Sequence, residues 1–88
     1  MRFRNKVVLV VGGNSGIGLA SAQAFAAEGG IVRLTGRDQA TIDAAVAGID
    51  GARGYRADIA DLDAMEAVIA DIAARDGRID TLFVNAGV

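Results

Sequence analysis

The chain has 88 residues and a net charge of −2, which is enough for one small domain spanning 1–88. It contains no Cys and no His, which excludes disulfides and thiolate chemistry and argues against a zinc or copper site, so we expect no bound metal. Nine cationic residues are scattered among eleven acidic ones, so no basic face predicts nucleic-acid binding. The apolar run 7–11 is too short for a signal-peptide core or a membrane span, and we expect a cytoplasmic protein without a membrane partner.

The first elements follow from the pattern of apolar residues. The segment "KVVLVV" (6–11) is β-branched and apolar throughout, which is typical of a strand buried on both faces of a sheet. A helical pattern over 15–28 follows, with one face formed by Ile17, Ala20, Ala24 and Phe25. The segment "GGIVRLTG" (29–36) predicts a second strand after a glycine stop.

The second half of the chain repeats this alternation. Asp38 is a candidate cap for a helix to Ala47, whose apolar side is formed by Ile42, Val46 and Ile49. The segment "GARGYRADI" (51–59) predicts a third strand, more weakly because its alternating apolar weight comes from Tyr55, Ala57 and Ile59 alone.

The strongest helical pattern covers 61–75, with Asp61 as a candidate cap and an apolar face formed by Leu62, Met65, Ile69 and Ile72. Gly77 ends this helix, and "IDTLFVNAG" (79–87) predicts a last buried strand. The order β-α-β-α-β-α-β implies right-handed crossovers and a parallel sheet, so the predicted fold class is α/β.

Four glycines occur within seven positions between the first strand and the first helix: Gly12, Gly13, Gly16 and Gly18. Glycine permits sharp turns and lets a phosphate approach the backbone where a Cβ would clash. The following helix has unpaired N–H groups and a positive dipole end at its start, which suits a pyrophosphate. A plain flexible turn is the alternative, but one glycine would suffice for that role.

Other nucleotide sites are less compatible with this loop. A P-loop needs Lys and then Ser or Thr after its last glycine, and Leu19 stands there instead. The ordinary spacing G-x-G-x-x-G fails because its third position is Ser21. An S-adenosylmethionine site usually has an acidic residue at the end of the second strand, and this strand ends in "LTGR".

The end of the second strand bears on the choice of cofactor. A carboxylate there favours the free 2′-hydroxyl of NAD, whereas a nearby Arg accommodates the 2′-phosphate of NADP. Gly36 removes the acid and leaves space, and Arg37 supplies guanidinium donors. We therefore expect NADP rather than NAD, the alternative being that Arg37 is a solvated surface residue.

These motifs resemble the N-terminal half of the short-chain dehydrogenase/reductase family. "GGNSGIG" matches the family glycine motif through Gly12, Gly16, Ile17 and Gly18, and the end of the family N-N-A-G motif matches 85–87. The resemblance implies a Rossmann-type three-layer fold with a sheet order of 3-2-1-4, incomplete without later strands, and a homo-oligomer. It also implies that Asn14, Ser15 and Ile17 line the pyrophosphate and that Arg37 contacts the 2′-phosphate. Asp58 and Ile59 would contact the adenine. Beneath the ribose and adenine would lie Asn85, Ala86 and Gly87.

The sequence departs from the family pattern in two ways. Val11 replaces the Thr that opens the glycine motif, and Val84 replaces the first Asn of N-N-A-G, so a hydrogen bond between the loop and the fourth strand is lost, worth about 1 kcal/mol if buried. The family also uses a Tyr-x-x-x-Lys for catalysis, but the sole tyrosine, Tyr55, is followed four residues later by Ile59. Tyr55 is therefore interpreted as a sheet residue.

The resemblance implies that this chain is the cofactor-binding part of an oxidoreductase, which transfers hydride between a nicotinamide and a small carbonyl or alcohol substrate. We expect the 88 residues to be a fragment of that enzyme and to be inactive alone. Two alternatives stay open: a nucleotide-binding module without redox chemistry, and a structural piece that associates through the open apolar edge of "LFV" (82–84).

Overall fold

The structure is a computed structural model that describes residues 2–12, 14 and 16–85. Four strands alternate with three helices in the predicted order, with these bounds: β1 Val7–Val11, α1 Gly16–Ala27, β2 Ile31–Gly36, α2 Gln39–Ala47, β3 Arg53–Arg56, α3 Leu62–Asp76 and β4 Thr81–Val84. None of the helices in these ranges is long and apolar enough to cross a membrane.

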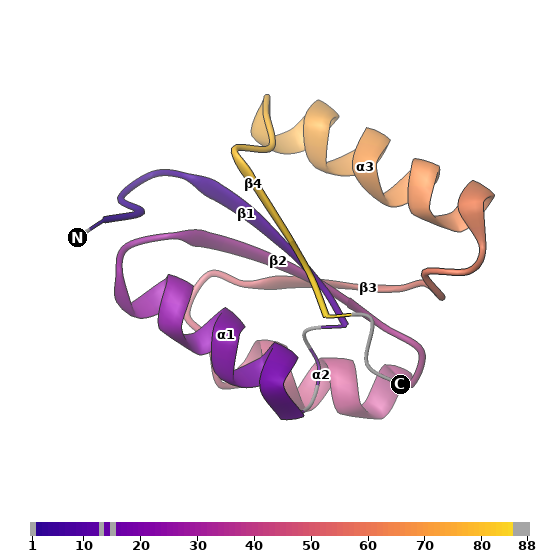
Figure 1. The fold of residues 1–88 in the computed structure, drawn as a ribbon, viewed down its shortest axis with the longest axis horizontal. Coiled ribbons are helices and arrows are strands. Elements are labelled where there is room, and N and C mark those ends of the chain that lie inside the picture. Colours follow the sequence, from indigo (N-terminus) through magenta and orange to yellow (C-terminus); the bar gives the residue numbers. More distant parts are fainter. Residues whose placement is uncertain (1, 13, 15, 86–88) are drawn as a thin grey trace.

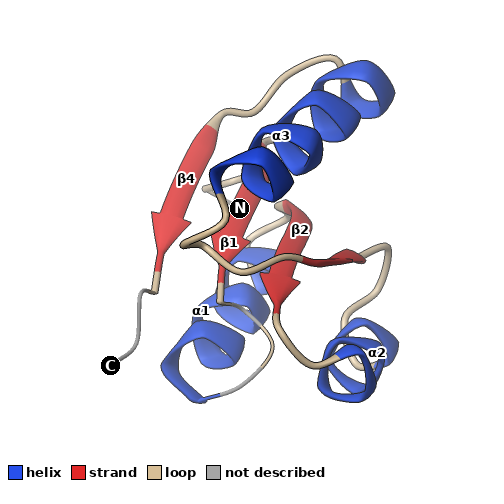
Figure 2. Cartoon of the chain, turned by 90° about the vertical axis from the view of Figure 1, so that its right-hand side faces the viewer, coloured by secondary structure: helices blue, strands red, loops and turns tan. Residues whose placement is uncertain are grey.

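The strands form one parallel sheet in the order β3-β2-β1-β4, which confirms the predicted topology. Helices α1 and α2 cover one face and α3 covers the other, giving three layers (Figures 1 and 2). In the register, Val11 lies opposite both Thr35 of β2 and Val84 of β4, and Gly36 lies opposite Arg56 of β3. The carboxyl ends of all four strands therefore meet at one edge of the sheet.

Strand β1 supplies both cores because it is buried on both faces. Val8 and Val10 pack with residues of β2, α1 and α2, whereas Val7, Leu9 and Val11 pack under α3 with Val68 and Ile72. The continuous apolar run of β1 is what a central parallel strand requires, since helices cover both of its faces.

The inner face of α1 agrees with the predicted one at Phe25, which packs against the core, but differs from it at the other three positions. Ile17 is 73% exposed, and Ala20 and Ala24 are also exposed, while Gly18 and Ala22 are buried. A Cβ on Gly18 would collide with the backbone carbonyl of Gly12. The helix therefore places small residues against the sheet at Gly18 and Ala22, where the backbones approach closely, while Leu19 and Phe25 pack against the edges of the same core.

Helix α3 begins after Asp61, whose carboxylate accepts from the amide of Ala64 as predicted, but its buried face is rotated. Val68 and Ile72 are buried, whereas Leu62 is 73% exposed and Ile69 is 43% exposed. The prediction was wrong for these last two positions. The helix contains apolar residues and alanines on most sides, so its periodicity permits more than one stripe.

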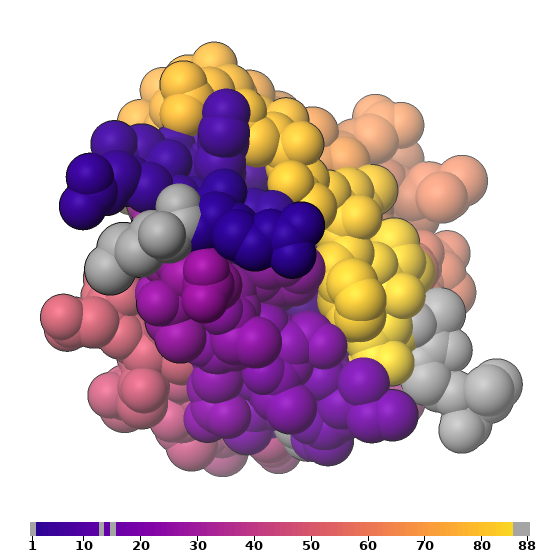
Figure 3. Space-filling model, turned by 60° about the vertical axis from the view of Figure 1, so that its left-hand side comes forward, coloured from indigo at the N-terminus to yellow at the C-terminus, as the bar shows by residue number. Residues whose placement is uncertain are grey.

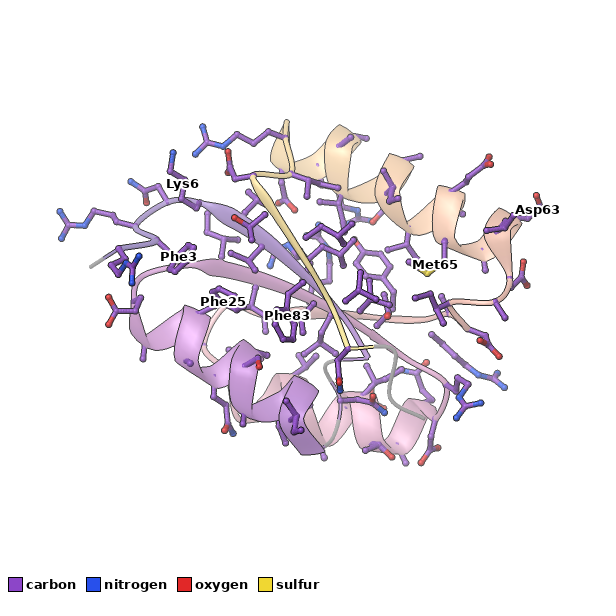
Figure 4. All side chains as sticks on the ribbon, in the orientation of Figure 1. Phe3, Lys6, Phe25, Asp63, Met65 and Phe83 are labelled. Carbon is purple, nitrogen blue, oxygen red and sulfur yellow. The ribbon has the colours of Figure 1, made fainter. Side chains whose placement is uncertain are left out.

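An aromatic cluster joins the N-terminal segment to α1 and β4. The ring centroids of Phe3 and Phe25 are 4.9 Å apart, and those of Phe25 and Phe83 are 6.0 Å apart. Both pairs are edge-to-face, the arrangement favoured by aromatic quadrupoles, and Figure 4 shows the three rings close to one another above α1.

Strand β4 is less buried than the sequence predicts. Leu82 is 57% exposed and Val84 is 47% exposed, and within the described ranges β4 pairs with β1 alone. Figure 3 shows β4, in yellow, lying along the surface beside α1. The open apolar edge expected from "LFV" is therefore present.

A polar cluster connects the sheet to α3. The guanidinium of Arg33 donates from Nε and Nη2 to the two carboxylate oxygens of Asp76, at 2.8 and 3.0 Å, and Arg53 donates to the same carboxylate at 2.9 Å. The Arg33 side chain is 9% exposed and that of Asp76 is 12% exposed. Arg33 also donates from Nη1 to the backbone carbonyls of Gly51 at 2.8 Å and of Val32 at 3.1 Å, so all three of its side-chain nitrogens are paired.

Replacing Asp76 with Asn should lower the free energy of unfolding by about 3 kcal/mol, because an almost buried Arg33 would lose its counter-charge. Urea titration followed by circular dichroism measures this change. Arg75→Gln, which removes the exposed pair with Asp71, is the matched control and should cost less than about 1 kcal/mol. Equal effects of the two substitutions would contradict the importance of the buried pair.

The same pair makes stability depend on pH. Hydrogen bonding from Arg33 lowers the pKa of Asp76, so the folded pKa lies below the unfolded value. The stabilisation is therefore present above about pH 4 and is lost as the pH falls through the folded pKa. In Asp76→Asn this acid-dependent loss should be smaller than in the parent protein.

Candidate functional site

A cleft of about 570 Å³ lies at the carboxyl edge of the sheet. Residues at or just beyond the ends of all four strands line it, together with the start of α2: Val11, Gly12, Asn14, Thr35, Gly36, Arg37, Asp38, Thr41, Ala57, Asp58, Ile59 and Asn85. In open α/β sheets, ligands bind beyond the carboxyl ends of the strands where the strand order reverses, which here is around β1.

The corner between β1 and α1 has no space for side chains at two of its glycines. Gly12 has φ +80°, and a Cβ there would lie 2.6 Å from the backbone oxygen of Asn85. Gly18 faces the carbonyl of Gly12 and the amide nitrogen of the Asn85 side chain. The predicted glycine motif and Asn85 are therefore brought together in space, and glycine is needed for this contact.

Gly16 has a different role at the same corner. It has φ +55°, and a Cβ built on it would have no described atom within 4 Å. Helix α1 begins at Gly16 and has no acidic residue in its first turn, so the positive end of its dipole is not offset by a neighbouring carboxylate of that turn. Such a helix start is suited to an anionic group that approaches the backbone.

Thr35 of β2 was not among the predicted site residues, but it contacts the loop directly. Its hydroxyl oxygen accepts a hydrogen bond from the amide of Gly12 at 3.2 Å, and its side chain is buried. The amide of Asn85 also donates to the carbonyl of Val11 at 2.9 Å. Although Val11 lacks a hydroxyl, the start of the loop is thus bonded to β2 and, through backbone atoms, to the end of β4.

The space above Gly36 is filled by another residue of the chain. A Cβ on Gly36 would collide with the side-chain amide of Asn14. The sequence interpretation, in which Gly36 leaves space for the cofactor, is therefore corrected: the missing side chain accommodates Asn14. Arg37 is exposed and lines the cleft directly after β2.

Asp38 is the N-cap of α2, as predicted. Its carboxylate accepts from the amide of Ala40 at 3.3 Å and from the hydroxyl of Thr41. The hydrogen bond from Thr41 is the main cause of a lowered Asp38 pKa, with a smaller contribution from the charge of Arg56. Asp38 is therefore ionised at neutral pH, and its negative charge lies in the wall of the cleft.

The far side of the cleft is formed by the segment after β3. Asp58 accepts from the amide of Ala60 at 2.9 Å, which fixes a turn, and Ile59 is 41% exposed. Both residues line the cleft, as their predicted role at an adenine ring requires.

The structure therefore brings together six of the predicted cofactor residues: Gly12, Asn14, Arg37, Asp58, Ile59 and Asn85. Gly18 lies against the carbonyl of Gly12 behind the loop, whereas Gly16 and Ile17 do not line this cleft. Ser15, Ala86 and Gly87 lie outside the described residues. Thr35 was not predicted from the sequence. The feature that could have indicated it is a hydroxyl side chain in an otherwise largely apolar strand, one residue before the end of β2.

Tyr55 lies away from the cleft. Its phenol donates to Asp71 of α3 and accepts from Nε of Arg53 at 2.7 Å, so it belongs to the polar cluster under α3. Burial raises the pKa of the phenol, which therefore stays protonated. Its location agrees with its interpretation as a sheet residue.

Comparison with known proteins identifies the family. A sequence model described as short chain dehydrogenase matches residues 6–88. The chain belongs to the short-chain dehydrogenase family. Members of this family are oxidoreductases that bind NAD or NADP, and the predicted glycine loop and strand order are consistent with that membership.

Several relatives share substantial sequence identity with the chain. Meso-2,3-butanediol dehydrogenase of Serratia marcescens is 40% identical over 90 residues, which cover 100% of this chain and 36% of that protein. Galactitol 2-dehydrogenase of Agrobacterium fabrum is 42% identical over 90 residues, covering 100% of this chain and 35% of that protein. The chain thus spans about a third of the length of these relatives.

Solved structures show the same fold. A short chain dehydrogenase from Bacillus anthracis has a TM-score of 0.91 and 34% identity, covering 96% of this chain and 35% of that one. L-sorbose reductase from Gluconobacter frateurii, in complex with NADPH and L-sorbose, has a TM-score of 0.92 and 30% identity, covering 98% of this chain and 35% of that one.

Thr35→Val should weaken dinucleotide binding about threefold to tenfold and lower the free energy of unfolding by about 1 kcal/mol. The substitution keeps the side-chain shape but leaves the Gly12 amide without its acceptor. Ligand titration and urea unfolding measure the two effects. Thr35→Ser retains the hydroxyl and should bind nearly as well as the parent; unchanged binding by Thr35→Val would contradict the role of this hydrogen bond.

Gly16→Val should abolish dinucleotide binding while preserving the helical circular dichroism signal. The new side chain would enter open space and block approach to the backbone, at a cost of about 1–2 kcal/mol for its positive φ. Gly51→Val is the matched control, because Gly51 also has a positive φ (+73°) and open space around its Cβ position. Gly51→Val should bind normally, and normal binding by Gly16→Val would show that the pyrophosphate lies elsewhere.

Proposed function

We propose that this chain is the cofactor-binding part of an NADP(H)-dependent short-chain oxidoreductase. The observation that carries the proposal is Arg37, placed at the cleft directly after β2, with glycine rather than a carboxylate at position 36. A guanidinium at this place suits the 2′-phosphate of NADP, whereas NAD-selective sites favour an acidic group. The NADPH complex of the related L-sorbose reductase is consistent with this choice.

The remaining cofactor contacts follow the order of the strands along the cleft. The pyrophosphate would lie at the corner formed by Gly12, Asn14 and the start of α1, where bare backbone and a positive helix dipole coincide. Asp58 and Ile59 would contact the adenine through its amino group and ring face. Asn85 would lie beneath the ribose, and we extend this path to Ser15, Ile17, Ala86 and Gly87 on the basis of the sequence motifs.

The bound nicotinamide would supply the hydride chemistry, in exchange with a small carbonyl or alcohol substrate. The residues of this chain would bind and orient the dinucleotide. Because the 88 residues contain no Tyr-x-x-x-Lys, we propose that they do not turn over substrate by themselves.

Association through β4 is the second candidate function. The exposed side chains of Leu82 and Val84 lie on a strand that, among the described residues, pairs on one side alone. An unpaired apolar edge favours pairing with another chain. Such association would be compatible with a homo-oligomer and does not require that the cleft binds a nucleotide.

Arg37→Ala should weaken NADP⁺ binding by about 10- to 150-fold, the equivalent of losing about 1.5–3 kcal/mol of charge-assisted hydrogen bonding. Binding of NAD⁺ should change little, because NAD⁺ carries no 2′-phosphate. Calorimetric titration of both cofactors against the parent and the variant gives the two ratios.

Arg4→Ala serves as the control, since Arg4 is exposed and precedes the amino end of β1, at the opposite edge of the sheet. It should leave both affinities unchanged. Equal weakening of both cofactors by Arg37→Ala, or no weakening of either, would reject NADP selectivity; failure of the parent protein to bind either cofactor would reject the proposed function as a whole.

A further inference from the structure

A second arginine lies beside the proposed 2′-phosphate site. Arg56, the last residue of β3, is opposite Gly36 in the parallel register. Its Nε donates to the backbone carbonyl of Arg37 at 3.2 Å. Arg56 is exposed, and its two terminal nitrogens make no hydrogen bond with any residue that the structure describes.

The alternation of side chains along β3 places Arg56 on the same side of the sheet as α2. Arg53 and Tyr55 contact Asp76 and Asp71 of α3 on the other face. A Cβ on Gly54 would instead collide with Ile42 of α2. Because successive side chains of a strand point to opposite faces, Arg56 shares the face of Gly54, where α2 begins at the cap Asp38.

The charges lining the cleft explain why a second cation matters. Arg37 lines the cleft together with the carboxylates of Asp38 and Asp58. With one guanidinium and two carboxylates, the cleft would repel a phosphate, which itself carries between one and two negative charges. With Arg56, the positive and negative charges at the ends of β2 and β3 are equal in number.

We propose that Arg56 is a further specificity-determining residue for NADP(H), acting together with Arg37 at the 2′-phosphate. It fixes the backbone carbonyl of Arg37 and supplies positive charge that offsets the two carboxylates of the cleft. This inference rests on the proposed function, since it concerns the same cofactor. Arg56 acts in part by positioning Arg37, and we expect it to affect the choice between NADP(H) and NAD(H) rather than the hydride transfer itself.

Two small probes separate the 2′-phosphate from the rest of the cofactor. Adenosine 2′,5′-bisphosphate carries this phosphate and adenosine 5′-monophosphate lacks it, so the ratio of their dissociation constants reports selectivity without any turnover. Arg56→Gln should weaken binding of the bisphosphate about threefold to tenfold, as expected for an exposed charge near a phosphate, and should change binding of the monophosphate less than about twofold.

Matched variants test the cause. Arg56→Lys keeps the charge and should retain most of the selectivity, whereas Arg4→Gln makes the same charge change at the opposite edge of the sheet and should have no effect. The selectivity of the parent should also decrease at high salt more than that of Arg56→Gln. Circular dichroism and thermal unfolding of each variant check that the fold is retained.

The outcomes distinguish the inference from the function on which it rests. If the parent prefers the bisphosphate but Arg56→Gln keeps the same preference, or weakens both probes equally, the inference is wrong and the proposed function stands. A loss in Arg56→Lys as large as in Arg56→Gln would overturn charge as the cause. If the parent shows no preference for the bisphosphate, NADP selectivity itself is wrong.

Discussion

The parallel alignment of the four strands is the constraint on which the rest of the structure depends. It places all carboxyl ends at one edge, so that the residues after β1, β2, β3 and β4 form a single cleft although they are far apart in the sequence. Parallel strands that follow one another in the chain need a crossover connection, which here is a helix in each case. These helices bury β1 from both sides. The stable centre of the fold and the cleft at its edge are therefore two results of one arrangement.

The face of the sheet under α3 and the cleft at its carboxyl edge use charge differently. Under α3, Arg33 and Asp76 are nearly buried and fully paired, so their charges contribute to the attachment of the helix. Arg37 and Asp38 line the cleft, Arg56 donates to the backbone of Arg37 beside it, and all three are exposed and lie at strand ends. Exposed charges of this kind add little to folding, but they can select among ligands that differ by one phosphate. The position of a charge thus separates a structural role from the recognition role that we propose.

The sequence was sufficient to predict the element order and the strand order, and it directed attention to the strand ends where the cleft lies, since these follow from apolar periodicity, glycine spacing and the family resemblance. It predicted the buried faces of α1 and α3 only in part: Phe25, Met65 and Ile72 pack against the cores as expected, whereas Ile17, Leu62 and Ile69 are exposed. Gly18 and Ala22 face the sheet because backbones approach there, a three-dimensional condition that hydrophobicity does not reveal. The contacts of Thr35 with Gly12 and of Asn14 with Gly36 join segments distant in sequence, so local patterns could not indicate them.

The inner and outer sides of α1 should differ in how well they tolerate larger side chains, because small residues occupy the positions closest to the sheet. At Gly18 even one added carbon would meet the Gly12 carbonyl, whereas Ala20 and Ala24 point to solvent on the same helix. The outer positions can accept bulky or charged replacements, including a cysteine carrying a fluorescent dye, with no thiol elsewhere in the chain to compete for the label. A reporter could therefore be attached within a few residues of the loop without altering the backbone that forms it.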